Sequence, residues 1–318
     1  MVAPCGGGRK LGVRRPHKDQ DLPLSAIGLD RLPVPRRQRI LSLVDALGDL
    51  KALPQVTQRA LSCIQDSRSS STELSAIIAT DQAISARLLG MANSAFGRGV
   101  RPFVSVQEAV VRLGYRNVQD VLLSIAASNL LEKPLPLYDV APGELWRHSV
   151  ATAISARLVA LRCQVPQNNA AYVAGLMHDA GRFVLDRGLL PSEKSAIRGI
   201  VAHDRTSFQN AEYEVLGFSH AEVGAVLLHR WGLSEEVVHA VAVHHRPSLS
   251  IEEGLGAAIH AADVLALLAL PISRPGWLFA VEPLISSRFG ISPDSRVLPE
   301  LLTEIKAGFD SAVRLVGR

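Results

Sequence analysis

The amino-acid sequence predicts an all-α protein with two helical lobes, and three observations support this prediction. The chain has 318 residues, of which 47% are hydrophobic but only 5% aromatic, a composition typical of helical proteins with aliphatic cores. Apolar residues recur with the helical period along most of the chain, and no segment alternates strictly between apolar and polar residues. A proline-rich stretch near residues 133–142 interrupts the helical period, so we place the boundary between the lobes there.

The first 36 residues are expected to form a disordered basic leader. Residues 1–39 contain nine Lys or Arg against three Asp, so the net charge of +4 resides in this segment. The leader is rich in Gly and Pro and can bury little apolar surface. Because it has no aromatic residues interleaved with the basic ones, a solvated tail is favoured over a nucleic-acid contact, and binding of nucleic acid is the weakest of the functions considered.

The sequence also carries information about the cellular compartment. No apolar stretch reaches the roughly 18–20 clean residues that a membrane span needs, and the nearest one is interrupted by His260 and Asp263. No apolar segment of a secretory signal follows the amino-terminal arginines. The three cysteines are odd in number and widely spaced, which indicates reduced thiols. We therefore expect a cytoplasmic protein without membrane contact.

The first lobe is expected to be a helical bundle over residues 37–135. Pro54 stands near a helix start, where a missing N–H is harmless. Asp81 is a good N-cap for a helix that follows a break at Thr80. Ser105 opens another helix at capping-box spacing, and Gly114 is expected to end it before a further apolar-faced helix begins.

The second lobe is expected over residues 140–270, with a carboxy-terminal flank at 271–318. The helical period predicts helices at about 143–163, 167–180, 191–204, 206–216, 220–231, 234–245 and 251–270, and a final helix at 299–316. No glycine-rich phosphate loop and no internal repeat is present. Whether residues 271–299 cover a site or lie beside it stays open at this level.

The second lobe contains all but one of the ten histidines. Several of them stand at helix ends or within a turn of a carboxylate. Neutral imidazole and carboxylate are ligands for divalent zinc, iron, manganese or nickel, and several together can hold one or two ions. The candidate metal ligands come from five predicted helices and are His148, His178, Asp179, His220, His244, His245 and Asp263.

Asp179 raises a specific electrostatic question. The predicted helix over 167–180 places it in the last turn, just before Gly181, where the helix dipole disfavours a carboxylate. An unpaired buried carboxylate would be costlier still. A positive centre is therefore expected opposite His178 and Asp179. A metal ion would supply it, and so would a simple pairing with Arg182 or with a protonated His148.

Structural interpretations of the other residues remain open as well. The pair His244–His245 could be a charge cap of a helix C-terminus. His260 fits equally a partner of a metal ligand and a core histidine. Asp263 lies between two apolar neighbours, which favours burial with a partner. The remaining histidines of this lobe are interpreted as surface or packing residues: His203, His229 and His239.

The order of these residues resembles the HD superfamily of metal-dependent phosphohydrolases, and the motifs of both lobes resemble its HDOD branch. The resemblance runs from about residue 50 to 270. It rests on "LPQV" (53–56), "IIATDQAISARLLGMANSAFG" (77–97), "SVQEAVVRLGYRNV" (105–118), "WRHS" (146–149), "AYVAGLMHDAGR" (171–182) and "FSHAEVGAVLLHRWGL" (218–233).

The resemblance implies an amino-terminal helical bundle packed against an HD-like helical lobe. Such proteins occur in bacteria, commonly in signalling and regulation alongside cyclic-di-GMP or phosphorelay modules, and usually have no assigned enzymatic activity. Members of the HDOD branch often lack several metal ligands, yet every ligand position is filled by His or Asp here. Three departures from the related cyclic-di-GMP phosphodiesterases argue against hydrolysis of cyclic-di-GMP. Arg182 replaces their lysine, and Arg246 follows the paired histidines in place of glutamate. No Gly–Tyr–Pro motif follows.

The favoured function is a regulatory signal-transduction module that binds a signalling protein through its first lobe and retains a metal site in its second. The alternative is a metal-dependent phosphohydrolase acting on a nucleotide or cyclic dinucleotide. In that case Asp179 would be catalytic, and Arg182 would neutralise charge on the phosphoryl group. The expected shells are His148, His178, Asp179 and Asp263 for one ion, and His220, His244 and His245 for a second.

Overall fold

The computed structural model describes residues 29–48, 53–95, 103–166, 170–246, 254–270, 276–277, 289 and 295–315. Over these residues the fold is all-α, as predicted, without a strand; one isolated bridge pairs Leu135 with Val140. Most of the predicted leader and most of the 271–299 segment lie outside the described residues. None of the helices in the described ranges is both long and apolar enough to span a membrane.

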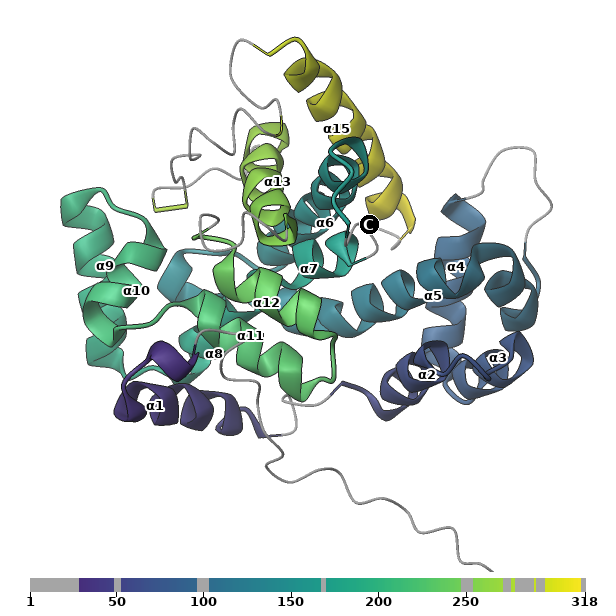
Figure 1. Ribbon diagram of the computed structural model, residues 1–318, viewed down its shortest axis with the longest axis horizontal. Coiled ribbons are helices and arrows are strands. Elements are labelled where there is room, and N and C mark those ends of the chain that lie inside the picture. The colour runs from purple at the N-terminus through teal and green to yellow at the C-terminus, as the bar shows by residue number, and fades with distance from the viewer. Residues whose placement is uncertain are drawn as a thin grey trace, which may run out of the picture.

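The first lobe consists of four helices at one end of the molecule (Figure 1): α2 (Gln55–Gln65), α3 (Ser71–Ala79), α4 (Gln82–Ala95) and α5 (Val106–Leu131). Their apolar faces enclose a separate small core. The predicted helix starts are confirmed by their caps. The Asp81 carboxylate accepts from the backbone N–H of Ile84 at 3.0 Å, and the Ser105 hydroxyl accepts from that of Glu108 at 3.1 Å.

Gly114 ends the first helical segment, as predicted, and a second segment follows it directly and runs to Leu131. Both segments are labelled α5, and Gly114 forms the kink between them, with φ 74° and ψ 160°. Glycine reaches this backbone conformation without the steric cost that a side chain would add. The second half of α5 packs into the core of the second lobe.

The second lobe surrounds the long helices α6 (Glu144–Arg162) and α13 (Leu255–Ala269), which pack on each other and on α7 (Ala171–Met177). Helices α8 (Ala180–Gly188), α11 (His220–Arg230) and α12 (Glu235–Val243) complete the centre, while α9 (Pro191–Asp204) and α10 (Phe208–Leu216) pack together at the far end (Figure 1). Helix α15 (Val297–Leu315) contacts α6, α13 and α4, so it touches both lobes.

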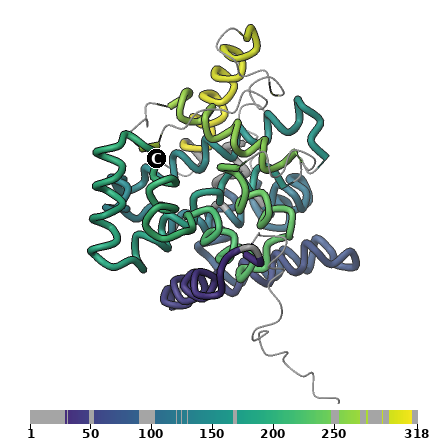
Figure 2. Tube along the Cα trace, turned by 60° about the vertical axis from the view of Figure 1, so that its left-hand side comes forward, coloured from purple at the N-terminus to yellow at the C-terminus, as the bar shows by residue number. Residues whose placement is uncertain are grey.

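Helix α1 (Val34–Asp45) packs against α8 and α11 of the second lobe, although the sequence assigns it to the first. Both views show it, in purple, along the lower side of the second lobe (Figures 1 and 2). Its buried Ile40, Leu43 and Val44 belong to the second lobe's core, and Asp45 pairs with Arg230 at 2.5 Å. The apolar period shows that this helix buries one face, but a period does not show which neighbour covers that face.

Candidate metal centre

The segment that carries His178 and Asp179 is a junction between two helices. The predicted helix over 167–180 is too long: α7 ends at Met177, and α8 begins at Ala180 and runs through Gly181. Asp179 therefore stands at the N-cap position of α8, where the helix dipole favours a carboxylate, and the expectation of a disfavoured last-turn position was wrong. Its side chain makes no capping hydrogen bond and is free to face the neighbouring helices.

Gly181 allows α8 and α11 to approach at the level of their backbones. A Cβ atom at this position would lie 1.9 Å from the carbonyl oxygen of His220 and 2.6 Å from the backbone nitrogen of Gly224. This close contact brings the start of α11 beside the start of α8. As a result Asp179 Oδ1 lies 3.2 Å from His220 Nε2.

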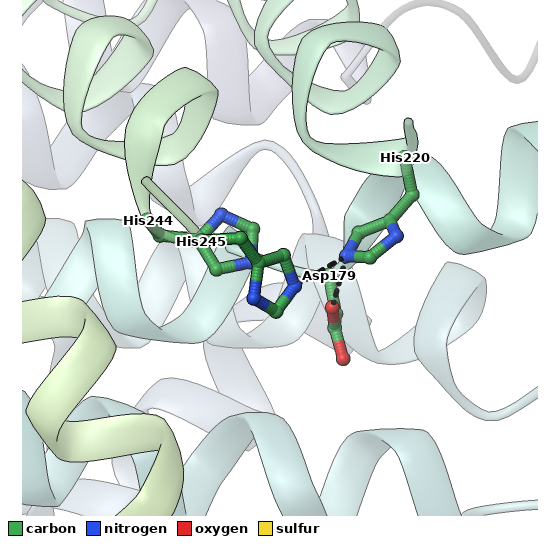
Figure 3. A group of neighbouring side chains, drawn as sticks. All are labelled: Asp179, His220, His244 and His245. Carbon is green, nitrogen blue, oxygen red and sulfur yellow. Dashed lines mark hydrogen bonds and ion pairs between the residues drawn. The ribbon is translucent and has the colours of Figure 1, made fainter. Parts of the chain in front are cut away.

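The structure brings together all seven predicted ligands, which we call the His/Asp cluster. They form two groups whose donor atoms lie within 4.8 Å of one another: His148, His178 and Asp263, and Asp179, His220, His244 and His245. Figure 3 shows the second group, where the imidazole at the start of α11 and the two that follow α12 lie beside Asp179. His245 is half-buried, and the other six are at most 1% exposed.

This grouping differs from the expected shells in the position of Asp179. We expected it with His148 and His178, and the structure places it with the three later histidines. Its second oxygen nevertheless lies 3.4 Å from His178 Nε2 and 3.7 Å from His148 Nε2. The carboxylate is therefore positioned between the two groups of the cluster.

Hydrogen bonds to carbonyl oxygens set the orientation of two cluster imidazoles. His178 Nδ1 donates to the Gly175 carbonyl at 2.8 Å, and His244 Nδ1 donates to that of Val241 at 2.7 Å. Both acceptors are last-turn carbonyls, which a helix end leaves without a helical partner. A carbonyl can only accept, so the hydrogen is on Nδ1, and in the neutral ring Nε2 presents a lone pair to the cluster.

Two pairs of imidazole nitrogens approach each other closely. His148 Nε2 lies 3.3 Å from His178 Nε2, and His220 Nε2 lies 3.0 Å from His245 Nε2. Facing lone pairs at such distances repel each other unless a proton or a cation lies between them. Two nitrogens that bind the same ion, each at about 2.0–2.1 Å, come this close to each other.

Buried polar atoms of the cluster also lack hydrogen bonds. Within the described part of the chain these include Asp263 Oδ2 and His244 Nε2, while the Asp179 carboxylate is met by Arg182 Nε at 2.8 Å and His220 Nε2 at 3.2 Å. A buried polar atom without a partner costs roughly 1–3 kcal/mol, and more if it is charged. A divalent ion would satisfy all of them, so the donor set fits one or two ions.

The charges of the cluster are mutually dependent. Burial alone would raise the pKa of Asp179, but the Arg182 guanidinium and the His178 imidazole hold it well below its usual value. Burial, with repulsion from charged neighbours, lowers the pKa of His244 to about 3. Burial opposes a charge on His220 as well, but Glu212 raises its pKa to about 9. A proton on His220 is thus the species that an ion would replace.

Arg182 and Trp277 cover one side of the cluster. Arg182 Nε lies 2.8 Å from Asp179 Oδ1, and its guanidinium lies 4.2 Å from the centre of the Trp277 ring. The same ring packs edge-on against His148, with the ring centres 5.2 Å apart. Both residues are buried, at 3% and 2% exposure. The sequence pointed to Arg182, whereas a lone tryptophan in the carboxy-terminal flank carried no signal for this position.

Two further buried residues form hydrogen bonds to members of the cluster. His260 donates from Nδ1 to the His244 carbonyl at 2.9 Å, so it holds the backbone of that ligand. Glu212 on α10 accepts from His220 Nδ1 at 2.7 Å, and sequence reasoning missed it. An acidic residue in an amphipathic helix is usually exposed, so Glu212 could not be recognised from the sequence.

The helical fold agrees with the comparisons to known proteins. The HDOD domain model matches residues 50–247, and the chain belongs to this family. A curated relative from Treponema pallidum (strain Nichols), named "Uncharacterized protein", is 28% identical over 240 residues; the match covers 71% of this chain and 45% of the relative, so the chain spans about half its length.

Solved structures share the fold. A "Putative phosphohydrolase" from Shewanella amazonensis SB2B has a TM-score of 0.66 at 24% identity, covering 87% of this chain and 98% of that one. An "HDOD domain protein with unknown function" from Geobacter sulfurreducens has a TM-score of 0.64 at 24% identity, covering 88% and 96%. A "Putative signal transduction protein" from Marinobacter aquaeolei VT8 has a TM-score of 0.65 at 22% identity, covering 89% and 65%.

Proposed function

We propose that this protein is a signal-transduction regulator that acts mainly by binding a partner protein, and that its second lobe holds one or two divalent ions. The observation that carries the proposal is the burial of the His/Asp cluster. Six of its seven side chains are at most 1% exposed, and Trp277 packs over His148 and Arg182. Catalytic metal sites keep a position open for water or substrate, whereas structural sites are closed.

The first lobe is the proposed docking surface for the partner. Its core is separate from that of the metal lobe, so its outer face does not depend on the cluster for its shape. Val104 and Val111, near the start of α5, are 72% and 60% exposed, the highest values among the large apolar side chains of the described residues. An apolar surface of this kind suits a helix of a regulatory or signalling protein.

A second function, metal-dependent phosphohydrolysis of a nucleotide or cyclic dinucleotide, is favoured by one observation. The donor set is complete, and the Arg182 guanidinium lies beside it, ready to stabilise a phosphoryl group. A bound ion would supply an acidic water molecule at neutral pH. The ions would be held by the two groups described above, with Asp179 between them. This function requires Trp277 to move away from the cluster.

Metal analysis and turnover of the purified protein separate these functions. We expect one or two equivalents of a divalent ion in the wild type, at least a tenfold loss in Asp179→Ala, and no loss in Asp204→Ala, which changes an exposed aspartate of α9. With manganese or iron added, neither wild type nor Trp277→Ala should hydrolyse bis(p-nitrophenyl) phosphate or a cyclic dinucleotide. Metal-free wild type would refute the ion site, and turnover by either protein would establish the hydrolase.

The docking proposal has its own test. Wild-type protein should capture a specific partner from its host's lysate, and the double variant Val104→Asp, Val111→Asp should not. Leu190→Asp is the matched control, because Leu190 is 57% exposed on the second lobe. Equal capture by the double variant would show that the first lobe's apolar face is not the docking surface.

A further inference from the structure

Glu212 is a fully buried carboxylate that is hydrogen-bonded on both oxygens. Its Oε2 accepts from the backbone N–H and from Nδ1 of His220, both at 2.7 Å. Its Oε1 accepts from the Tyr138 hydroxyl at 2.7 Å. Burying a carboxylate is costly unless such donors compensate it. Two of the three donors belong to one residue of the His/Asp cluster, so the carboxylate acts on that residue.

The place of His220 in its helix explains why it needs a carboxylate from elsewhere. His178 and His244 follow helix ends, where last-turn carbonyls three residues earlier accept from their Nδ1 atoms. His220 is the first residue of α11, and a helix start offers free N–H groups but no carbonyl of a preceding turn. Glu212 provides both missing partners, an acceptor for the ring and an acceptor for the free backbone N–H.

The hydrogen bond from Nδ1 determines what His220 presents to the cluster. With Nδ1 hydrogen-bonded to Glu212, Nε2 is the nitrogen that faces the cluster, 3.2 Å from Asp179 Oδ1 and 3.0 Å from His245 Nε2. A carboxylate behind an imidazole ligand also makes the ligand more basic than a carbonyl does, because it carries a full negative charge. His220 should therefore be the strongest imidazole donor of its group.

Tyr138 holds Glu212 in turn. It belongs to η3 (Pro136–Tyr138), in the connection between the lobes, and its ring packs edge-on against Phe208 with the centres 5.0 Å apart. Burial and the adjacent Glu212 carboxylate raise the pKa of Tyr138 well above its usual value, so its hydroxyl stays protonated and donates. The ring also lies 5.2 Å from the Arg182 guanidinium.

We infer that Glu212 is a positioning residue for the metal ligand His220, and that Tyr138 secures Glu212 for this role. The inference rests on the ion site of the proposed function. It adds a residue outside the predicted ligand set and a path of hydrogen bonds from the ion site to the connection between the lobes. Removal of such partners typically weakens metal affinity about 10–100-fold.

The test uses Co²⁺ as the probe with the full-length protein. Isothermal titration should give a Kd about 10–100-fold higher for Glu212→Gln than for wild type, and the visible ligand-field spectrum of bound Co²⁺ should change. Glu214→Gln is the matched control: it removes the same charge from an exposed position of α10 and should bind like wild type. Circular dichroism checks that each variant is folded, and Glu212→Ala should bind more weakly than Glu212→Gln.

An unchanged Kd and an unchanged spectrum in folded Glu212→Gln would overturn the inference while leaving the ion site intact. Failure of the wild type to bind Co²⁺ would instead overturn the ion site itself. If the Glu212 variants do not fold, Tyr138→Phe decides, because it keeps every ligand and the carboxylate. We expect a several-fold weaker Co²⁺ affinity for this variant, and an affinity equal to wild type would refute the inference.

Discussion

Gly181 is the residue at which two backbones of the metal lobe come closest. Its α-carbon faces the carbonyl of His220 and the N–H of Gly224, with no room for a side chain. The residues on either side of it carry the chemistry: Asp179 is a proposed ligand, and Arg182 pairs with it. A backbone contact cannot be relieved by rotating a side chain, so any added atom must separate α8 from α11.

Gly181→Ala should therefore cost stability and metal affinity together. Overpacked sites typically lose about 1–3 kcal/mol, and a clash with backbone places this one at the upper end. Urea denaturation measures the free energy of unfolding, and titration with Co²⁺ measures the affinity. Gly199→Ala on α9 is the control, because a Cβ there meets nothing within 4 Å. It should stabilise the protein by about 0.5–1 kcal/mol; equal effects of both changes would contradict the argument.

At the level of elements, the position of α1 shows that a helix can belong to a lobe distant in sequence. Leu43 packs so closely on α8 that a Cβ at Gly188 would lie 2.7 Å from its Cδ2 atom. The Asp45–Arg230 pair joins α1 to the end of α11. Helix α1 thus covers the outer side of the two helices that position Asp179 and His220.

Ile40→Ala should consequently loosen the metal lobe and leave the first lobe unchanged. Ile40 is 0% exposed, and such truncations cost about 2–5 kcal/mol. Hydrogen exchange should accelerate in α8 and α11 but not in α3 and α4. Val34→Ala on the same helix, at a position 53% exposed, should change stability by less than about 0.5 kcal/mol. Faster exchange in α3 and α4 would place α1 with the first lobe.

On the scale of the whole molecule, two cores of unequal size divide the protein. The large core joins the second lobe, α1, α15 and the second half of α5, while the small one holds α2, α3, α4 and the first half of α5. The His/Asp cluster lies among helices of the large core. An ion bound there stabilises the helices that carry its ligands. The small core contributes no side chain to the cluster, so the ion does not stabilise it directly.

Removal of the ion should therefore lower the stability of the second lobe only. An ion at 100 times its Kd stabilises the folded state by about 2.7 kcal/mol. After chelation, we expect faster hydrogen exchange in α6, α7, α8, α11, α12 and α13 and unchanged exchange in α3 and α4. Asp179→Ala should show no response to added ion. A response of equal size in both lobes would mean that the two cores unfold as one unit.

The seven side chains of the cluster could be singled out from the sequence because imidazoles and carboxylates in apolar helices are conspicuous. Asp263 lies between apolar neighbours, and several histidines lie at helix ends. Both positions favour burial with a partner. The break after Met177 was not predicted, because α7 and α8 are both apolar and no Gly or Pro separates them at the junction. Glu212 and Trp277 could not be recognised, since an acidic residue and a single aromatic residue are common on any helical protein's surface.

The sequence by itself determined the all-α class and most helix starts, and it singled out the seven side chains of the cluster as candidate ligands. These follow from local physics: the helical period, the capping side chains and the cost of burying charge without a partner. The tertiary structure alone decided which oxygen of Asp179 faces which group, that α1 covers the metal lobe, and that Glu212 and Trp277 stand beside the ligands. Such relations depend on which helix faces meet in space, and the periodicity of one segment contains no information about its neighbour.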